Sequence, residues 1–251
     1  MLVFLITCPL VFLAGFVDSI AGGGGLISLP AYMFAGLPAH AAIATNKMSS
    51  AMGTVVAALH FWKQGFMKWK ICLPGIITAF VGSWCGARLN LFTDEKALQI
   101  MMLVLLPFIA FYVFRSKSLT KTAEEEYPLK RTILLCALIS FVIGIYDGIY
   151  GPGTGTFLML LFTGVCHMSL EDSAGTTKAI NLTTNISALA VYLMHGAVLL
   201  PLGIAAGVCN MMGNYLGSHC FTSKGASFVK PVILLVLAVF FARVVFQMTS
   251  L

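Results

Sequence analysis

Charged residues are scarce in this 251-residue sequence: Asp, Glu, Lys and Arg make up 10% of it, whereas 59% is hydrophobic. An average soluble domain is about 25% charged, so this chain has too few polar residues to cover a water-exposed surface. Between residues 1 and 62 only Asp18 and Lys47 are ionised, and between residues 132 and 170 only Asp147. Apolar runs of this length predict membrane spans. The composition therefore argues against soluble enzymes and nucleic-acid binders, and predicts a polytopic membrane protein.

Several motifs are also missing. The seven cysteines form no CxxC pair and lie mostly in apolar runs, so they predict neither a disulfide framework nor a metal site. A His-rich metal cluster, a GxSxG motif and an Asp pair suited to proteolysis are lacking, so an intramembrane enzyme is the weakest hypothesis. We expect no enzyme activity, no cofactor and no metal. The apolar run at residues 1–16 lacks a basic n-region, and we expect it to stay as a mature membrane segment.

The remaining charges predict the topology. Most Lys and Arg residues lie in short breaks between apolar runs, and the positive-inside rule places those breaks in the cytoplasm. The apolar runs predict spans at residues 2–20, 26–34, 39–62, 71–91, 98–114, 132–149, 156–165, 173–194, 198–221 and 228–246. We divide the chain into a first membrane repeat (1–115), a cytoplasmic linker (116–130) and a second membrane repeat (131–251), which together form one membrane domain.

An internal duplication supports this division. The string GFVDSIAGGGGL at residues 15–26 resembles GIYDGIYGPGTG at 144–155. Asp18 and Asp147 are 129 positions apart, and Lys47 and Lys178 are 131 positions apart. We therefore predict an all-α fold of two homologous repeats with about eight membrane helices, in which the first helix of each repeat is broken at the Gly-rich motif.

The orientation of the repeats depends on the broken helices. A helix of ten residues rises only ~15 Å, half of a ~30 Å hydrocarbon core. If the broken segments are re-entrant hairpins, each half crosses three times and the repeats are inverted; if they span, the repeats are parallel. The distribution of Lys and Arg favours inverted repeats.

The two Gly-rich breaks are the first candidate site. Irregular backbone at membrane depth costs several kcal/mol per unpaired group, unless it is buried in protein or lines a watery cavity. Broken helices at matching positions of two halves indicate a transporter site, with helix N-termini that favour an anion. Close helix packing through small residues is the alternative explanation. The binding residues predicted from the breaks are Gly22, Gly23, Gly24, Gly25, Gly151, Gly153 and Thr154.

Two intramembrane lysines extend this site. Lys47 and Lys178 each cost about 2.5–3.5 kcal/mol to insert, so they should face the interior with a partner. They either attract an anion or form structural ion pairs with the aspartates, and the two roles can coexist. Nearby amides and hydroxyls can donate hydrogen bonds to an oxyanion; we include Asn46, Thr176, Thr177 and Asn181. For Asp18 and Asp147, capping or ion pairing is slightly favoured over proton or cation coupling.

These motifs resemble those of a known family. The DSIAGGGGL string, followed by the Ala-Thr-Asn-Lys motif that ends at Lys47, resembles the TauE/SafE family of sulfite and organosulfur anion exporters. The GPGTG string and the Ala-Gly-Thr-Thr-Lys motif that ends at Lys178 are similar to that family's second signature. The resemblance implies a multi-pass carrier of the bacterial inner membrane for a small, sulfur-containing oxyanion.

The sequence thus predicts a secondary carrier that holds an anion at the midplane between the two repeats. An anion channel that uses the same cavity is the alternative. We expect a small anion and membrane lipid as partners and no nucleic acid, and a homodimer is left open. No ATP-binding motif is present, so a gradient must supply the energy.

Overall fold

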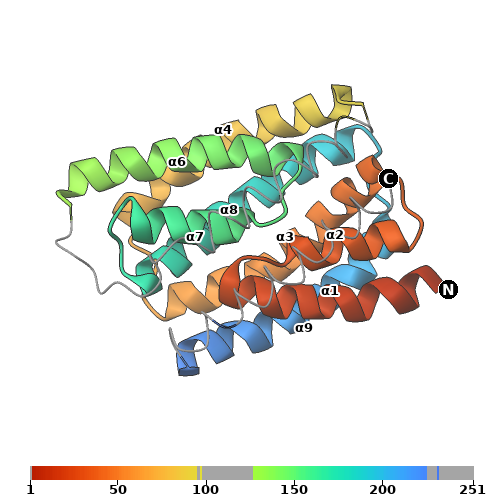
Figure 1. Cartoon of the computed structure of the whole chain (residues 1–251), viewed down its shortest axis with the longest axis horizontal. Coiled ribbons are helices and arrows are strands. Elements are labelled where there is room, and N and C mark those ends of the chain that lie inside the picture. Colours follow the sequence, from red (N-terminus) through yellow and green to blue (C-terminus); the bar gives the residue numbers. More distant parts are fainter. Residues whose placement is uncertain (1, 95–96, 98–126, 225–230, 232–251) are drawn as a thin grey trace.

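The computed structural model of the chain describes residues 2–94, 97, 127–224 and 231. These residues form eight α-helices and no strands (Figure 1). Each half contains a long helix, a short helix and two further long helices. The first half comprises α1 (Leu2–Ala21), α2 (Gly25–Phe34), α3 (Ala39–Lys63) and α4 (Trp69–Phe92). The second comprises α6 (Leu129–Ile149), α7 (Thr154–Gly164), α8 (Leu170–Met194) and α9 (Leu200–Lys224).

The predicted apolar segments correspond to these helices. Eight of the ten predicted spans match one helix each, with ends that agree to within three residues; the spans at 98–114 and 228–246 lie outside the described residues. Among the described helices, α1, α4 and α6 are long and apolar enough to cross a membrane. The all-helical membrane class is therefore supported. Helices α3, α8 and α9 are each 25 residues long but carry many buried polar residues.

Small residues bring two pairs of helices into close contact. Gly82 and Gly86 of α4 lie against the backbone of α6, and Gly213 and Gly217 of α9 lie against the backbone of α1. A Cβ atom at any of these positions would overlap a backbone carbonyl oxygen of the facing helix. Glycine at these four positions therefore allows the helix backbones to pack closely together.

The two short helices reverse the chain direction. Helix α2 contacts α1, and α7 contacts α6, so each short helix folds back beside the long helix that precedes it (Figure 1). Gly24 lies directly against Ala14 and Asp18 of α1, which is the contact of a tight hairpin.

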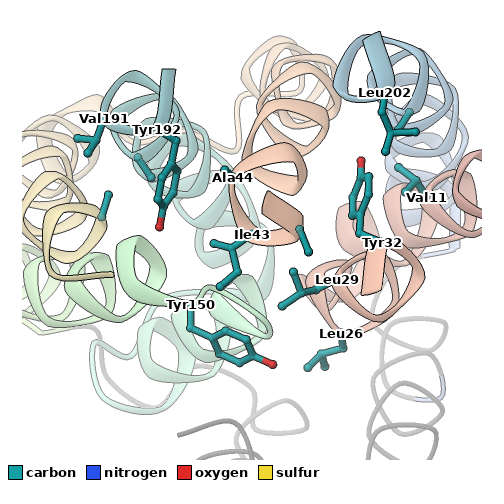
Figure 2. Packing of buried hydrophobic residues seen from close by; sticks show 14 of the residues in the cluster. Val11, Leu26, Leu29, Tyr32, Ile43, Ala44, Tyr150, Val191, Tyr192 and Leu202 are labelled. Atoms are coloured by element: carbon teal, nitrogen blue, oxygen red, sulfur yellow. The ribbon is translucent and has the colours of Figure 1, made fainter. Parts of the chain in front are cut away.

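A buried apolar cluster holds the short helices in place. Leu29 and Tyr32 of α2 and Ile43 of α3 are at most 1% exposed and belong to one cluster (Figure 2). The Tyr32 hydroxyl donates a hydrogen bond to Ser49 Oγ at 2.8 Å, so its polar end is also satisfied. Packing on α3 therefore holds α2 in place.

Candidate functional site

The two Gly-rich breaks meet each other. The Thr156 N–H donates to the Gly22 carbonyl at 3.2 Å, and the Thr156 hydroxyl donates to the Ala21 carbonyl at 2.7 Å. Gly22 has φ +72°, and a Cβ on it would overlap the backbone of Gly155. Glycine is needed at position 22 both for the left-handed backbone and for this contact. The breaks thus pair with each other instead of facing lipid, as irregular backbone in a membrane requires.

Each intramembrane lysine pairs with the aspartate of the other half. Lys47 Nζ lies 2.6 Å from Asp147 Oδ2, and both side chains are 2% exposed. Lys178 Nζ lies 2.7 Å from Asp18 Oδ2, with exposures of 3% and 14%. The ion-pair interpretation of the four residues is confirmed, and the pairs join α3 to α6 and α8 to α1. The pairs are needed because an isolated charge at this depth would be strongly destabilising.

Further hydrogen bonds fix both aspartates. Asp147 Oδ1 lies 2.7 Å from the Thr154 hydroxyl at the start of α7, and Lys47 Nζ also donates to Asn185 Oδ1 at 3.3 Å. In the other pair, the Gly24 N–H donates to Asp18 Oδ1 at 3.3 Å. Each carboxylate therefore connects the end of a long helix to the beginning of the short helix that follows it.

A small polar cavity lies between the two pairs and the two breaks. It comprises about 320 Å³ of space outside protein atoms, including its open mouth. Its lining combines the breaks with polar residues of α3 and α8: Asp18, Gly22, Gly25, Asn46, Lys47, Ser50, Asp147, Gly151, Thr154, Gly155, Asn181 and Asn185. The structure thus brings together nine residues singled out from the sequence, seven as binding residues and two as aspartates.

The other predicted binding residues do not line this cavity. Gly23 and Gly24 continue the first break, and Gly153, at φ +81°, is the N-cap of α7. The Thr176 hydroxyl lies 3.4 Å from Cys72 Sγ of α4. The Thr177 hydroxyl is buried without a partner in the described part of the chain. Lys178 does not line the cavity, but it pairs with Asp18, which does.

Three residues that line the cavity were not among the binding residues predicted from the sequence. Ser50, Gly155 and Asn185 lie in its lining. Asn185 is one helical turn from Asn181 on α8, so their i,i+4 spacing is a signal that the sequence did carry. Gly155 belongs to the GPGTG string. Ser50 follows Lys47 by three positions on α3, and only the helical period marks it.

One hydrogen-bonding atom in the lining of the cavity has no partner among the described residues. Asn46 is 8% exposed, and its Oδ1 atom is buried without a partner among the described residues. Helices α2 and α7 begin at Gly25 and Thr154 in the lining, and helix N-termini carry partial positive charge. Because an amide oxygen accepts hydrogen bonds and its burial without a partner is costly, a bound molecule that carries an O–H or N–H group would satisfy Asn46 Oδ1.

The chain was compared with known proteins. A model of the family "Sulfite exporter TauE/SafE" matches residues 7–244. A probable membrane transporter protein, ORF9 of Sinorhizobium sp, is 34% identical over 225 residues, covering 90% of this chain and 85% of the relative. Probable membrane transporter protein YfcA of Escherichia coli strain K12 is 34% identical over 236 residues, covering 94% and 87% respectively.

A probable membrane transporter protein of Haemophilus influenzae is 30% identical over 237 residues, covering 94% of this chain and 92% of the relative. No solved structure matches the chain significantly. The names of these relatives give a transport role without a substrate. The resemblance inferred from the glycine motifs is confirmed, and the chain belongs to the sulfite exporter TauE/SafE family.

Proposed function

We propose that this membrane transporter is a secondary carrier of small anions, with sulfite, sulfonates or related organosulfur oxyanions as its substrates. The observation that carries the proposal is the polar cavity in which Lys47, Asn46 and the beginnings of α2 and α7 come together. The substrate class comes from the name of the family. The anionic character of the substrate is inferred from Lys47 and the two helix N-termini in the lining.

The lining of the cavity suits an oxyanion. Lys47 supplies positive charge, and the amides of Asn181 and Asn185 and the Ser50 hydroxyl can donate hydrogen bonds. The N-termini of two helices add partial positive charge from their dipoles. Most of the 320 Å³ lies in narrow gaps between side chains and at the open mouth, so the enclosed space suits a water-sized group more than a bulky organic anion. Binding of a sulfonate therefore requires the breaks or the ion pairs to move.

The arrangement favours a carrier over a channel. The hydrogen bonds from Thr156 to Gly22 and Ala21 join the two breaks at the cavity, so a substrate must separate paired groups. In Figure 1, α1 and α6 run in opposite directions along the long axis, as do α3 and α8. This supports inverted repeats, in which rocking of one repeat against the other opens the cavity to alternate sides.

We place the protein in the bacterial inner membrane, where the positive-inside rule assigns the Lys-rich loops to the cytoplasm. Large apolar side chains on α4 support contact with lipid: Leu73, Ile77 and Phe80 are 56%, 60% and 42% exposed. Trp62 and Trp69, about half exposed at adjoining helix ends, suit the interface between membrane and water.

Counterflow in proteoliposomes tests this function. Vesicles preloaded with unlabelled sulfite should take up radiolabelled sulfite faster than empty vesicles, and the rate should saturate with external sulfite. A carrier gives this result because its binding site can return across the membrane with unlabelled sulfite bound, without having to return empty. Non-saturating flux with single-channel currents would indicate a pore, and no flux of sulfite, methanesulfonate or sulfoacetate would contradict an organosulfur carrier. Vesicles without protein are the control.

A further inference from the structure

We propose that Asp147 takes up one proton when a monovalent anion binds beside Lys47, so that anion and proton cross the membrane together. This inference rests on the proposed function, because it concerns the same cavity and names the ion that accompanies the substrate. Its basis is the charge balance of the site and the hydrogen bonds around Asp147.

The ionised groups of the site already cancel one another. Lys47 and Lys178 are matched by Asp147 and Asp18, in pairs of 2.6 and 2.7 Å. A bound monovalent anion would therefore leave one uncompensated negative charge among buried groups, which is strongly unfavourable. A proton on Asp147 removes that charge. It also releases Lys47, the lysine that lines the cavity, to pair with the anion.

The hydroxyl of Thr154 can satisfy Asp147 with or without the proton. Thr154 Oγ1 lies 2.7 Å from Asp147 Oδ1 and 2.7 Å from the Gly151 carbonyl oxygen. When Asp147 is ionised, the hydroxyl donates to the carboxylate. When Asp147 is protonated, its O–H donates to Thr154 Oγ1, and the Thr154 hydroxyl donates to the Gly151 carbonyl. Asp147, Thr154 and Gly151 can therefore keep their positions in both states.

Among the described residues, Lys47 is the one cation that pairs with Asp147. Lys47 of α3 forms its salt bridge, and Thr154 of α7 its other side-chain hydrogen bond. The nearby tyrosines are engaged elsewhere: Tyr146 of α6 donates to the Pro152 carbonyl at 2.6 Å, and Tyr192 of α8 donates to the Gly148 carbonyl at 2.8 Å.

From α4, the facing groups are the backbone at Ser83, Gly86 and Ala87, which contacts Gly148. Across the cavity, Asp18 lines the same space and is paired with Lys178. When the anion takes Lys47, Asp147 therefore has no other cation to balance it, and the proton takes that role.

Asp18 is held differently. Its carboxylate accepts hydrogen bonds from Lys178 Nζ and from the Gly24 N–H. Lys178 also donates to the Asp18 backbone carbonyl at 2.5 Å and does not line the cavity. The anion cannot take Lys178 from Asp18 as directly as it can take Lys47 from Asp147. The proton is therefore assigned to Asp147.

Proteoliposomes with an internal pH-sensitive dye test this assignment. Methanesulfonate is the probe because its own charge does not change near neutral pH. A methanesulfonate gradient imposed on the wild-type protein should move protons in the same direction, one per anion counted with labelled probe. The variant Asp147→Asn keeps the shape of the side chain but cannot gain the proton. Because the variant leaves Lys47 buried without its partner, the prediction concerns the ratio and not the rate: the methanesulfonate that it moves should carry net charge and no protons.

Asp172→Asn is the matched control, because Asp172 pairs with Lys68 away from the cavity, where Lys68 is 48% exposed. Its ratio of protons to anions should equal that of the wild type. Wild-type anion flux without protons would overturn this inference and leave the proposed function standing. Loss of proton movement in Asp18→Asn but not in Asp147→Asn would overturn the assignment to Asp147. No methanesulfonate flux at all would contradict the proposed function, and with it this inference.

Discussion

Replacement of Gly22 by alanine tests whether contact between the two breaks stabilises the fold. At φ +72° an alanine is strained, which costs about 1–2 kcal/mol. Its Cβ would also overlap the backbone at Gly155 and Thr156. Forcing extra atoms into a packed site costs about 1–3 kcal/mol. The total is about 2–5 kcal/mol, or roughly 4–20 °C in Tm at 2–4 °C per kcal/mol.

Gly65→Ala is the matched control for this variant. Gly65 has φ +78°, and a Cβ there meets nothing within 4 Å, so it carries the backbone strain without the contact. Thermal unfolding of both purified variants, followed with a thiol-reactive dye, should show that Gly22→Ala loses about 1–3 kcal/mol more stability than Gly65→Ala, which is roughly 2–12 °C more in Tm. Equal losses would refute the claim that the breaks are in structural contact.

Three further variants probe the same region by thermal unfolding and ligand-induced shifts. Lys47→Met leaves Asp147 buried without its cation and should cost about 3–5 kcal/mol, whereas Lys47→Met combined with Asp147→Leu should recover most of that loss. Thr156→Val removes the hydrogen bond of 2.7 Å to Ala21 and should lower stability by about 1 kcal/mol. Asn181→Leu should leave Tm within a few degrees of the wild type but weaken the stabilisation by sulfite.

Each of these variants has an outcome that counts against the structure. A double variant at Lys47 and Asp147 no more stable than the single one would mean that the two residues are not coupled. A Thr156→Val protein of wild-type stability would remove the evidence for the hydrogen bond between the breaks. If sulfite stabilises Asn181→Leu as strongly as the wild type, Asn181 does not bind the anion.

The helices and the duplicated charges could be predicted from the sequence because few residues decide them. Long apolar runs of this kind form helices in a membrane, because a helix satisfies its own backbone groups, and a buried lysine needs a partner. The sequence could not determine that Lys47 pairs with Asp147 and not with Asp18 of its own half. Both partners have the same chemistry, and the choice depends on how the halves pack.

The contact between Gly22 and Gly155 could not be predicted from the sequence either. Four successive glycines indicate an irregular backbone, but they carry no side chain whose pattern points to a partner. Ser50 was missed because α3 is polar on much of its buried surface, so apolar periodicity marks no single face. Residues of this kind become visible only when tertiary packing brings α3, α7 and α8 together.

The central claim is that a small anion binds in the cavity beside Lys47, and ligand-induced thermal stabilisation tests it most directly. Sulfite at about 100 times its Kd should stabilise the wild-type protein by about 2.7 kcal/mol, or roughly 5–11 °C. The variant that combines Lys47→Met with Asp147→Leu should fold but show no such shift. Equal stabilisation of the two proteins by sulfite would contradict binding at this cavity.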